Sequence, residues 1–163
     1  MNLVRRALEA ARQTDGELFL FLEDDLLFNR FIRQNLFAWE PLRSFRCGTH
    51  FFASIFDPGV RVRQIDQRRR WAVVDRHSAF GAQALVISRR TVEYLVTCWG
   101  AIRSTHADVK VALLAGLVCP IFYHQPSLVQ HVGLKSLWGG PYLYARDFDQ
   151  NWLENIKSTS IAE

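Results

Sequence analysis

The sequence has few cysteines, and their spacing suggests no cross-link or metal site. Three of the 163 residues are cysteine (Cys47, Cys98 and Cys119), and they are widely spaced. None belongs to a Cys-x-x-Cys pair, and no histidine lies at zinc-finger spacing from them. This pattern argues against a disulfide scaffold or a zinc finger, and it indicates small buried side chains in a reducing compartment.

The sequence also lacks a long apolar run. No apolar stretch approaches the roughly 18 residues that a membrane-spanning helix needs. The first thirteen residues, MNLVRRALEAARQ, have an amphipathic pattern without the apolar centre of a signal peptide. We therefore expect a cytoplasmic protein without a transmembrane segment.

The composition is that of one globular domain with a moderately basic surface. Apolar residues make up 49% of the chain and charged residues 22%, which is ordinary for a domain of this length. The net charge of +4 permits an anionic partner, but the basic residues form no long tract. Their densest group, residues 61–70, follows the turn signal Asp57-Pro58-Gly59. We interpret it as a solvated loop, with contact to a phosphate or an acidic acceptor as the alternative, and we predict no nucleic-acid partner.

The first forty residues predict an α/β unit. Apolar residues at helical spacing over 3–11 predict a helix. The unbroken apolar run 18–22 predicts a strand buried on both faces, as in a parallel sheet, and the acidic residues 23–25 follow it directly. Apolar residues at helical spacing from 28 to 36 then predict a helix that Pro41 terminates.

The remainder of the chain predicts further strands and helices, so the expected fold class is α/β, with a mixed sheet flanked by helices. We predict strands at 47–56, 71–74, 82–87, 121–123 and 128–132, and helices at 88–99 and 105–117. Ser88 is placed to cap the first of these helices. Residues 136–163 are rich in glycine and aromatic residues, and we expect an irregular or helical tail there, behind a domain of residues 1–135.

The three adjacent carboxylates of Glu23, Asp24 and Asp25 need a compensating partner. In open α/β sheets the carboxyl ends of the strands face the ligand crevice, and like charges there repel one another unless a cation or hydrogen-bond donors are present. Mg²⁺ and Mn²⁺ prefer oxygen ligands and commonly join a protein carboxylate to a substrate phosphate. One interpretation is therefore a divalent cation between Asp25 and a diphosphate. The other is an acidic loop at the N-terminus of the following helix.

Three segments resemble GT-A glycosyltransferases, in the same order along the chain. Residues 20–25, LFLEDD, resemble the hydrophobic strand and acidic DxD-type motif of that fold. Residues 80–88, FGAQALVIS, resemble its strand-to-helix segment that lines the active site. Residues 126–133, PSLVQHVG, are similar to a C-terminal stretch of the branching N-acetylglucosaminyltransferase IV family, and this match is the most specific.

The resemblance implies a transferase that moves a sugar from a nucleotide-sugar donor, with UDP as the expected nucleotide, to the hydroxyl of a glycan or other acceptor. The expected cofactor is Mn²⁺ or Mg²⁺ with Asp25 as a ligand. Glu23 and Asp24 are expected near the ribose or sugar hydroxyls, and Gly81 belongs to the segment expected to contact the donor. Because only one helix and one strand precede the acidic triplet, the resemblance implies a partial GT-A fold that lacks the N-terminal nucleotide-binding units.

Asp108 and His131 are the remaining candidate site residues. An inverting transfer needs a carboxylate that takes the proton of the acceptor hydroxyl, and Asp108 lies where the resembled family tends to place its base. The alternative is a capping box, because Thr105-x-x-Asp108 also fits a helix start. By resemblance, His131 is expected to complete the metal site or to contact the diphosphate, whereas a lone histidine is otherwise usually structural.

Two other functions compete with the transferase. The chain could be a remnant or accessory domain that keeps the fold without catalysis, or a metal-dependent phosphoesterase, although the several separated Asp and His motifs of such enzymes are not evident. A missing N-terminal half or a second copy of the chain are the expected protein partners. A second acidic motif, Asp147-x-Asp149, follows no apolar strand, and we interpret it as a surface loop.

Overall fold

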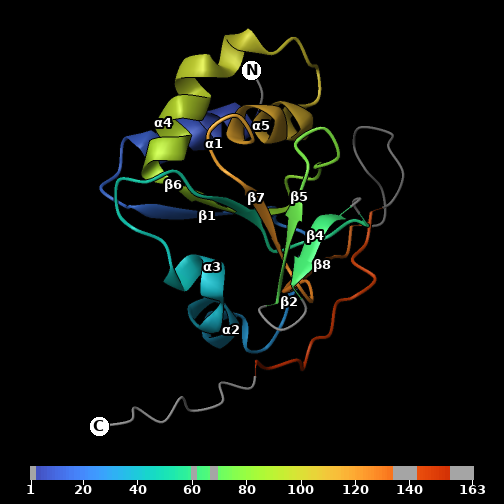
Figure 1. The fold of residues 1–163 in the computed structure, drawn as a ribbon. Helices are drawn as coiled ribbons and strands as arrows, with labels where there is room; N and C mark the ends of the chain where they lie inside the picture. Colours follow the sequence, from blue (N-terminus) through green and yellow to red (C-terminus); the bar gives the residue numbers. More distant parts are fainter. Residues whose placement is uncertain (1–2, 60–61, 67–69, 134–142, 155–163) are drawn as a thin grey trace, which may run out of the picture.

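A computed structural model of the chain describes residues 3–59, 62–66, 70–133 and 143–154. Its centre is a six-stranded mixed sheet with the strand order β1-β6-β3-β7-β5-β4, and helices cover both faces (Figure 1). This arrangement confirms the predicted α/β class and the mixed sheet flanked by helices. The strands of the sheet are β1 (Leu18–Leu22), β6 (Ala84–Ser88), β3 (Phe52–Ser54), β7 (Ile121–His124), β5 (Trp71–Val74) and β4 (Val62–Asp66).

The helices form two layers. Helices α1, α4 and α5 lie on one face of the sheet, and the short helices α2 and α3 lie on the other (Figure 1). A separate two-stranded ladder joins β2 to β8. The bounds are α1 (Leu3–Arg12), α2 (Ile32–Ala38), α3 (Glu40–Arg43), α4 (Arg89–Cys98), the 3-10 turn η1 (Trp99–Ala101), α5 (Ala107–Ala115), β2 (Leu26–Phe28) and β8 (Val129–His131).

The alternation of side chains along β6 divides the core between the two layers. Leu85 and Ile87 belong to the cluster that includes Leu95 of α4, while Val86 belongs to the opposite cluster with Trp39. All five residues are buried. Burying a leucine or isoleucine side chain contributes about 2 kcal/mol to the free energy of unfolding. Strand β6 therefore contributes side chains to the core on both faces of the sheet.

The prediction for β1 is right about the strand and wrong about its surroundings. β1 pairs antiparallel with β6, and the parallel pair in the sheet is β3 with β7. In the sheet that the described residues form, β1 is an edge strand. Leu20 is 46% exposed and Leu22 is 43% exposed, so the strand is not buried on both faces. A run of alternating Leu and Phe does not distinguish an edge strand from a central one.

The region expected to form one helix from 28 to 36 contains two elements. Residues 26–28 form β2, which pairs with the distant strand β8, and α2 begins only at Ile32. Pro41 lies in the first turn of α3 instead of ending a helix. Proline fits the first turn because its missing N–H has no partner within a helix at that position.

The other elements agree more closely with the predictions. Ser88 caps α4, because its Oγ accepts a hydrogen bond from the backbone N–H of Thr91 at 3.4 Å. Residues 62–66 form strand β4, although the basic group 61–70 was expected to be a loop; residues 61 and 67–69 of that group lie outside the described part. Cys47 is exposed, and Cys98 and Cys119 are only half-buried, which corrects the expectation of three buried cysteines.

The described part of the predicted tail, residues 143–154, packs against the domain. The Asn29 side-chain amide donates hydrogen bonds to the backbone carbonyls of Asp149 and Trp152, at 2.8 and 2.9 Å. Asp147 lies at the surface, where its carboxylate accepts hydrogen bonds from Oγ and N–H of Ser127 at 2.7 and 3.1 Å. Among the residues described, no helix has the length and apolarity to cross a membrane.

Candidate metal centre

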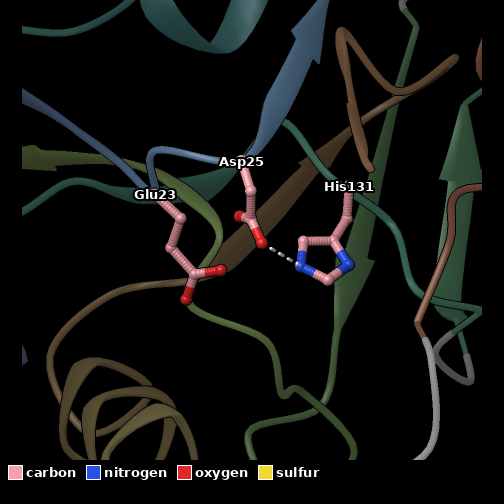
Figure 2. Close-up of side chains that lie close together, drawn as sticks. All are labelled: Glu23, Asp25 and His131. Carbon is pink, nitrogen blue, oxygen red and sulfur yellow. Dashed lines mark hydrogen bonds and ion pairs between the residues drawn. The ribbon is translucent and has the colours of Figure 1, made fainter. Parts of the chain in front are cut away.

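Glu23 is held at the end of β1 by the ladder to β6. Its backbone N–H donates to the carbonyl oxygen of Gln83 at 2.9 Å, so the pairing of the two strands continues one residue beyond β1. The side chain reaches toward Asp25 and His131 (Figure 2). The end of β1 thus delivers the first carboxylate of the site.

Asp25 and His131 are brought together by the β2–β8 ladder. Leu26 lies opposite His131 in that ladder, and the backbone N–H of Val132 donates to the carbonyl oxygen of Asp25 at 2.9 Å. Nε2 of His131 lies 2.9 Å from Oδ2 of Asp25 (Figure 2). The His131 side chain is only 12% exposed, whereas that of Asp25 is 39% exposed.

These three side chains can bind one cation. Glu23, Asp25 and His131 each offer one ligand atom, and the three atoms lie within 4.8 Å of one another. Oδ1 of Asp25 is buried and has no hydrogen-bond partner among the described residues. Leaving a buried carboxylate oxygen without a partner is costly, and a cation removes that cost. Two carboxylates and one imidazole suit Mn²⁺ well and fit Mg²⁺ through the oxygen ligands.

Gly133 leaves space for this pair of side chains. A Cβ atom on Gly133 would overlap Oδ2 of Asp25 and would lie 3.0 Å from Nε2 of His131. Any larger residue at this position therefore displaces the carboxylate or the imidazole. Sequence analysis assigned no separate role to Gly133, although this glycine ends the stretch 126–133 that carries the most specific resemblance.

Asp108 lies beside this group but outside it. It is in the first turn of α5, and its Oδ2 accepts a hydrogen bond from the backbone N–H of Gly81 at 3.0 Å. Helix α5 begins after His106 without a side-chain cap, so the capping-box alternative for Asp108 is wrong. Gly81 has a φ of +88°, a conformation that favours glycine. Asp108 therefore fixes a glycine turn at the edge of the site.

The comparisons with known proteins find no relative. The chain matches no protein-family model, no curated protein and no solved structure. The resemblance to GT-A glycosyltransferases is therefore untested by them, and the case for a function comes from the site itself.

The surroundings of Glu23 make its carboxyl group harder to ionise than it is in water. Partial burial of its carboxyl group raises the pKa of Glu23, and the neighbouring charge of Asp25 raises it further. His131 opposes this effect, while Asp24 and Asp108 add smaller contributions in the same direction as Asp25. Carboxylates that repel one another in this way are stabilised in their charged form by a nearby cation.

The structure therefore brings together only part of the predicted site. Asp25 and His131 lie together as expected, and Glu23, expected near the donor sugar, joins them. Asp24 is exposed and contributes no atom to the three-residue group. Oε1 of Gln83 is a further buried polar atom without a hydrogen-bond partner in the described part of the chain, and no pattern in the sequence singled it out.

Proposed function

We propose that Glu23, Asp25 and His131 hold a divalent cation, Mn²⁺ or Mg²⁺, in a glycosyltransferase that uses a nucleotide-sugar donor. One observation carries the proposal: three ligand atoms lie within 4.8 Å of one another. The orphaned Oδ1 of Asp25 supports it, because a bound cation is the simplest partner for that atom.

The residues around the site have different roles in the proposed reaction. A divalent cation here supplies charge neutralisation for the departing diphosphate of the donor. Asp25 and His131 would hold the cation, and the 2.9 Å contact between Oδ2 of Asp25 and Nε2 of His131 places these two side chains next to each other. The exposed side of Glu23 leaves room for donor oxygens beside the ligand group.

Asp108 is the proposed general base. One carboxylate oxygen, Oδ2, is bound by the N–H of Gly81, and this leaves Oδ1 for the acceptor hydroxyl. The hydrogen bond from Gly81 fixes the position of this carboxylate at the edge of the site. Asp108 would then remove the proton of the acceptor hydroxyl, and the cation would neutralise the donor diphosphate, within the same site.

Calorimetry with matched carboxamide variants tests the cation site. We expect one Mn²⁺ per chain, with affinity lowered at least about tenfold in Asp25→Asn because a ligand charge is lost. Asp24→Asn is the control, since this neighbouring carboxylate is exposed and outside the ligand group. Equal Mn²⁺ affinity in wild type and Asp25→Asn would remove Asp25 from the site and end the proposal.

A second titration tests the donor. Under the proposal, UDP binds in the presence of Mn²⁺ and much more weakly without it, because the cation joins the protein carboxylates to the diphosphate. Mn²⁺ binding without any UDP binding would retain the cation site and contradict a transferase that acts alone. That result would favour the alternative of a domain that keeps the fold without catalysis.

A further inference from the structure

Among the described residues, no strand pairs with the outer edge of β1, so backbone groups on that edge have no strand partner there. In an antiparallel pair, residues alternate between bonding the neighbouring strand and pointing away from it. The carbonyl of Glu17 accepts from Arg89 N–H at 3.0 Å, and the N–H of Glu23 donates to Gln83, so the odd-numbered residues bond β6. The even-numbered residues Leu18, Leu20 and Leu22 therefore direct their backbone groups to the free edge.

An apolar groove runs along the same edge. Its volume is about 370 Å³, and it lies between β1 and helix α2. The apolar lining includes Leu18, Leu20, Val86, Ile32, Leu36 and Phe37. Arg33 also lines the groove, with its guanidinium 5.7 Å from the centre of the Phe37 ring. Phe37 is 67% exposed, so the groove opens onto more apolar surface. Edge strands are usually guarded by lysine, proline or a bulge, and β1, with the sequence LFLFL, has none of these.

The charges at the two ends of β1 decide which partner fits. Asp15 and Glu17 precede the strand, and Glu23 and Asp24 follow it. Nε of Arg89 lies 3.6 Å from Oε1 of Glu17 and offsets that one charge, so the acidic character of the two ends comes mainly from Asp15, Glu23 and Asp24. A second copy paired antiparallel about Leu20 would place Glu17 opposite Glu23 of the partner subunit. Like charges directly opposite one another destabilise a strand pair. The edge therefore disfavours its own copy and favours a strand with basic ends.

We propose that the free edge of β1 binds an extended segment of another polypeptide as an added strand. The segment is apolar at alternate positions, where it fills the groove against α2, and it carries lysine or arginine at both ends. Main-chain hydrogen bonds to Leu18, Leu20 and Leu22 provide affinity, and the groove provides side-chain specificity. This surface lies beside Glu23 but needs no cation, so it goes beyond the proposed function.

A labelled peptide tests the surface directly. The probe is KKVTVTVKK, titrated with the full chain by fluorescence anisotropy in buffer with EDTA, so that failure of the cation site does not affect the result. We expect saturable binding. The peptide EEVTVTVEE should bind at least about tenfold more weakly because its ends repel the acidic ends of β1, and KKVTPTVKK should not bind because proline interrupts the strand.

Amide hydrogen exchange then shows whether the peptide adds a strand. With saturating peptide, the amides of Leu20 and Leu22 should exchange at least about tenfold more slowly, since they gain hydrogen bonds. The amides of Phe19 and Phe21 already bond β6 and should change little. Binding that leaves Leu20 unprotected would overturn strand addition.

Two matched variants locate the binding. Leu20→Lys should weaken the peptide at least about tenfold by placing a positive charge in the apolar groove. Leu117→Lys alters a leucine that is 54% exposed and outside the groove, and it should bind like wild type. Leu22→Lys serves as a second edge variant if circular dichroism shows that Leu20→Lys is unfolded. Equal binding by all the folded variants would overturn the proposal, as would a dimer of the free chain with Leu20 already protected.

Discussion

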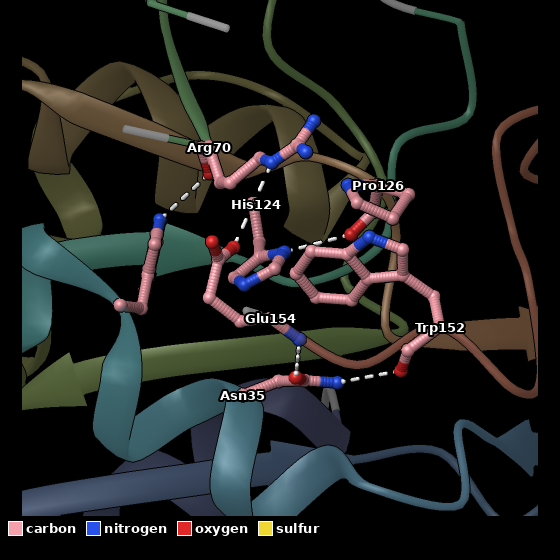
Figure 3. A network of polar contacts seen from close by, with 7 residues as sticks. Asn35, Arg70, His124, Pro126, Trp152 and Glu154 are labelled. Atoms are coloured by element: carbon pink, nitrogen blue, oxygen red, sulfur yellow. Dashed lines mark hydrogen bonds and ion pairs between the residues drawn. The ribbon is translucent and has the colours of Figure 1, made fainter. Parts of the chain in front are cut away.

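His124 and His131 lie close together in the sequence but in opposite environments. His124, at the end of β7, is 1% exposed, and its Nδ1–H donates to the carbonyl oxygen of Pro126 at 2.7 Å (Figure 3). Its ring lies 5.0 Å from that of Trp39 and 5.6 Å from that of Trp152. His131, at the end of β8, instead faces the carboxylates of Asp25 and Glu23.

The difference shows what makes a histidine structural or functional. Burial among aromatic rings lowers the pKa of His124 to about 4, so this imidazole stays neutral and acts as a packed polar side chain. An imidazole that lies against two carboxylates can instead share a cation with them. Both residues are histidines at the end of a strand, and the side chains around each one determine whether it packs in the core or faces carboxylates.

The largest expected effect comes from filling the space beside His131. Gly133→Ala places a methyl group on Oδ2 of Asp25 and should lower Mn²⁺ affinity roughly 100-fold, the upper range for residues that orient metal ligands. Gly100→Ala is the control, because a Cβ there meets no atom within 4 Å. Calorimetry on both variants measures the effect, and an unchanged affinity in Gly133→Ala would mean that Asp25 and His131 do not hold the cation.

Exchanging the two histidines for alanine should separate binding from stability. We expect His131→Ala to lower Mn²⁺ affinity at least about tenfold with little change in the free energy of unfolding. His124→Ala should lower the free energy of unfolding by about 3 kcal/mol, since it leaves a cavity and an unsatisfied carbonyl, and should leave Mn²⁺ affinity unchanged. Urea unfolding and calorimetry on both variants measure the two quantities. If both variants lost Mn²⁺ affinity, or both lost free energy of unfolding, the two histidines would not have separate roles.

The low pKa of His124 predicts acid sensitivity. The unfolded imidazole protonates near pH 6.5 and the folded one near pH 4. The folded pKa is the lower one, so this contribution to stability is complete above pH 6.5 and is lost as the pH falls toward 4. The loss is about 3 kcal/mol. Urea unfolding between pH 7 and pH 4 should show a shallower decline in His124→Gln than in wild type, and parallel profiles would contradict this role.

The smallest effect is expected at Glu23. Because this side chain is more exposed than that of His131, Glu23→Gln should lower Mn²⁺ affinity by a few-fold, less than Asp25→Asn does. Its pKa is raised in the folded chain, so wild-type Mn²⁺ affinity should also fall as protons occupy Glu23 at acid pH. Calorimetry at pH 5 and pH 7.5 measures this dependence. A larger loss of Mn²⁺ affinity in Glu23→Gln than in Asp25→Asn would mean that Glu23, and not Asp25, is the stronger ligand.

The features that the sequence predicted correctly depend on local patterns. Ser88 caps a helix through a neighbour three residues away, and the strands over 71–74 and 121–123 follow from short apolar runs. The sequence also placed a carboxylate group directly after a strand. Local periodicity and capping preferences were sufficient for these elements.

The features that it missed depend on contacts between distant segments. The strand at 26–28 exists because it pairs with 129–131, and no local pattern reveals that partner. The edge position of β1 follows from the strand order of the whole sheet. Gly133 ends the stretch 126–133, but its role depends on its contact with Asp25, more than a hundred residues away in the sequence.

Electron paramagnetic resonance of Mn²⁺ tests the cation site most directly. With histidine labelled by ¹⁵N, electron spin-echo measurements on bound Mn²⁺ should show coupling to one imidazole nitrogen, and this coupling should vanish in His131→Ala and persist in His124→Ala. A spectrum of free Mn²⁺ throughout the titration, or a nitrogen coupling that survives in His131→Ala, would contradict the site formed by Glu23, Asp25 and His131.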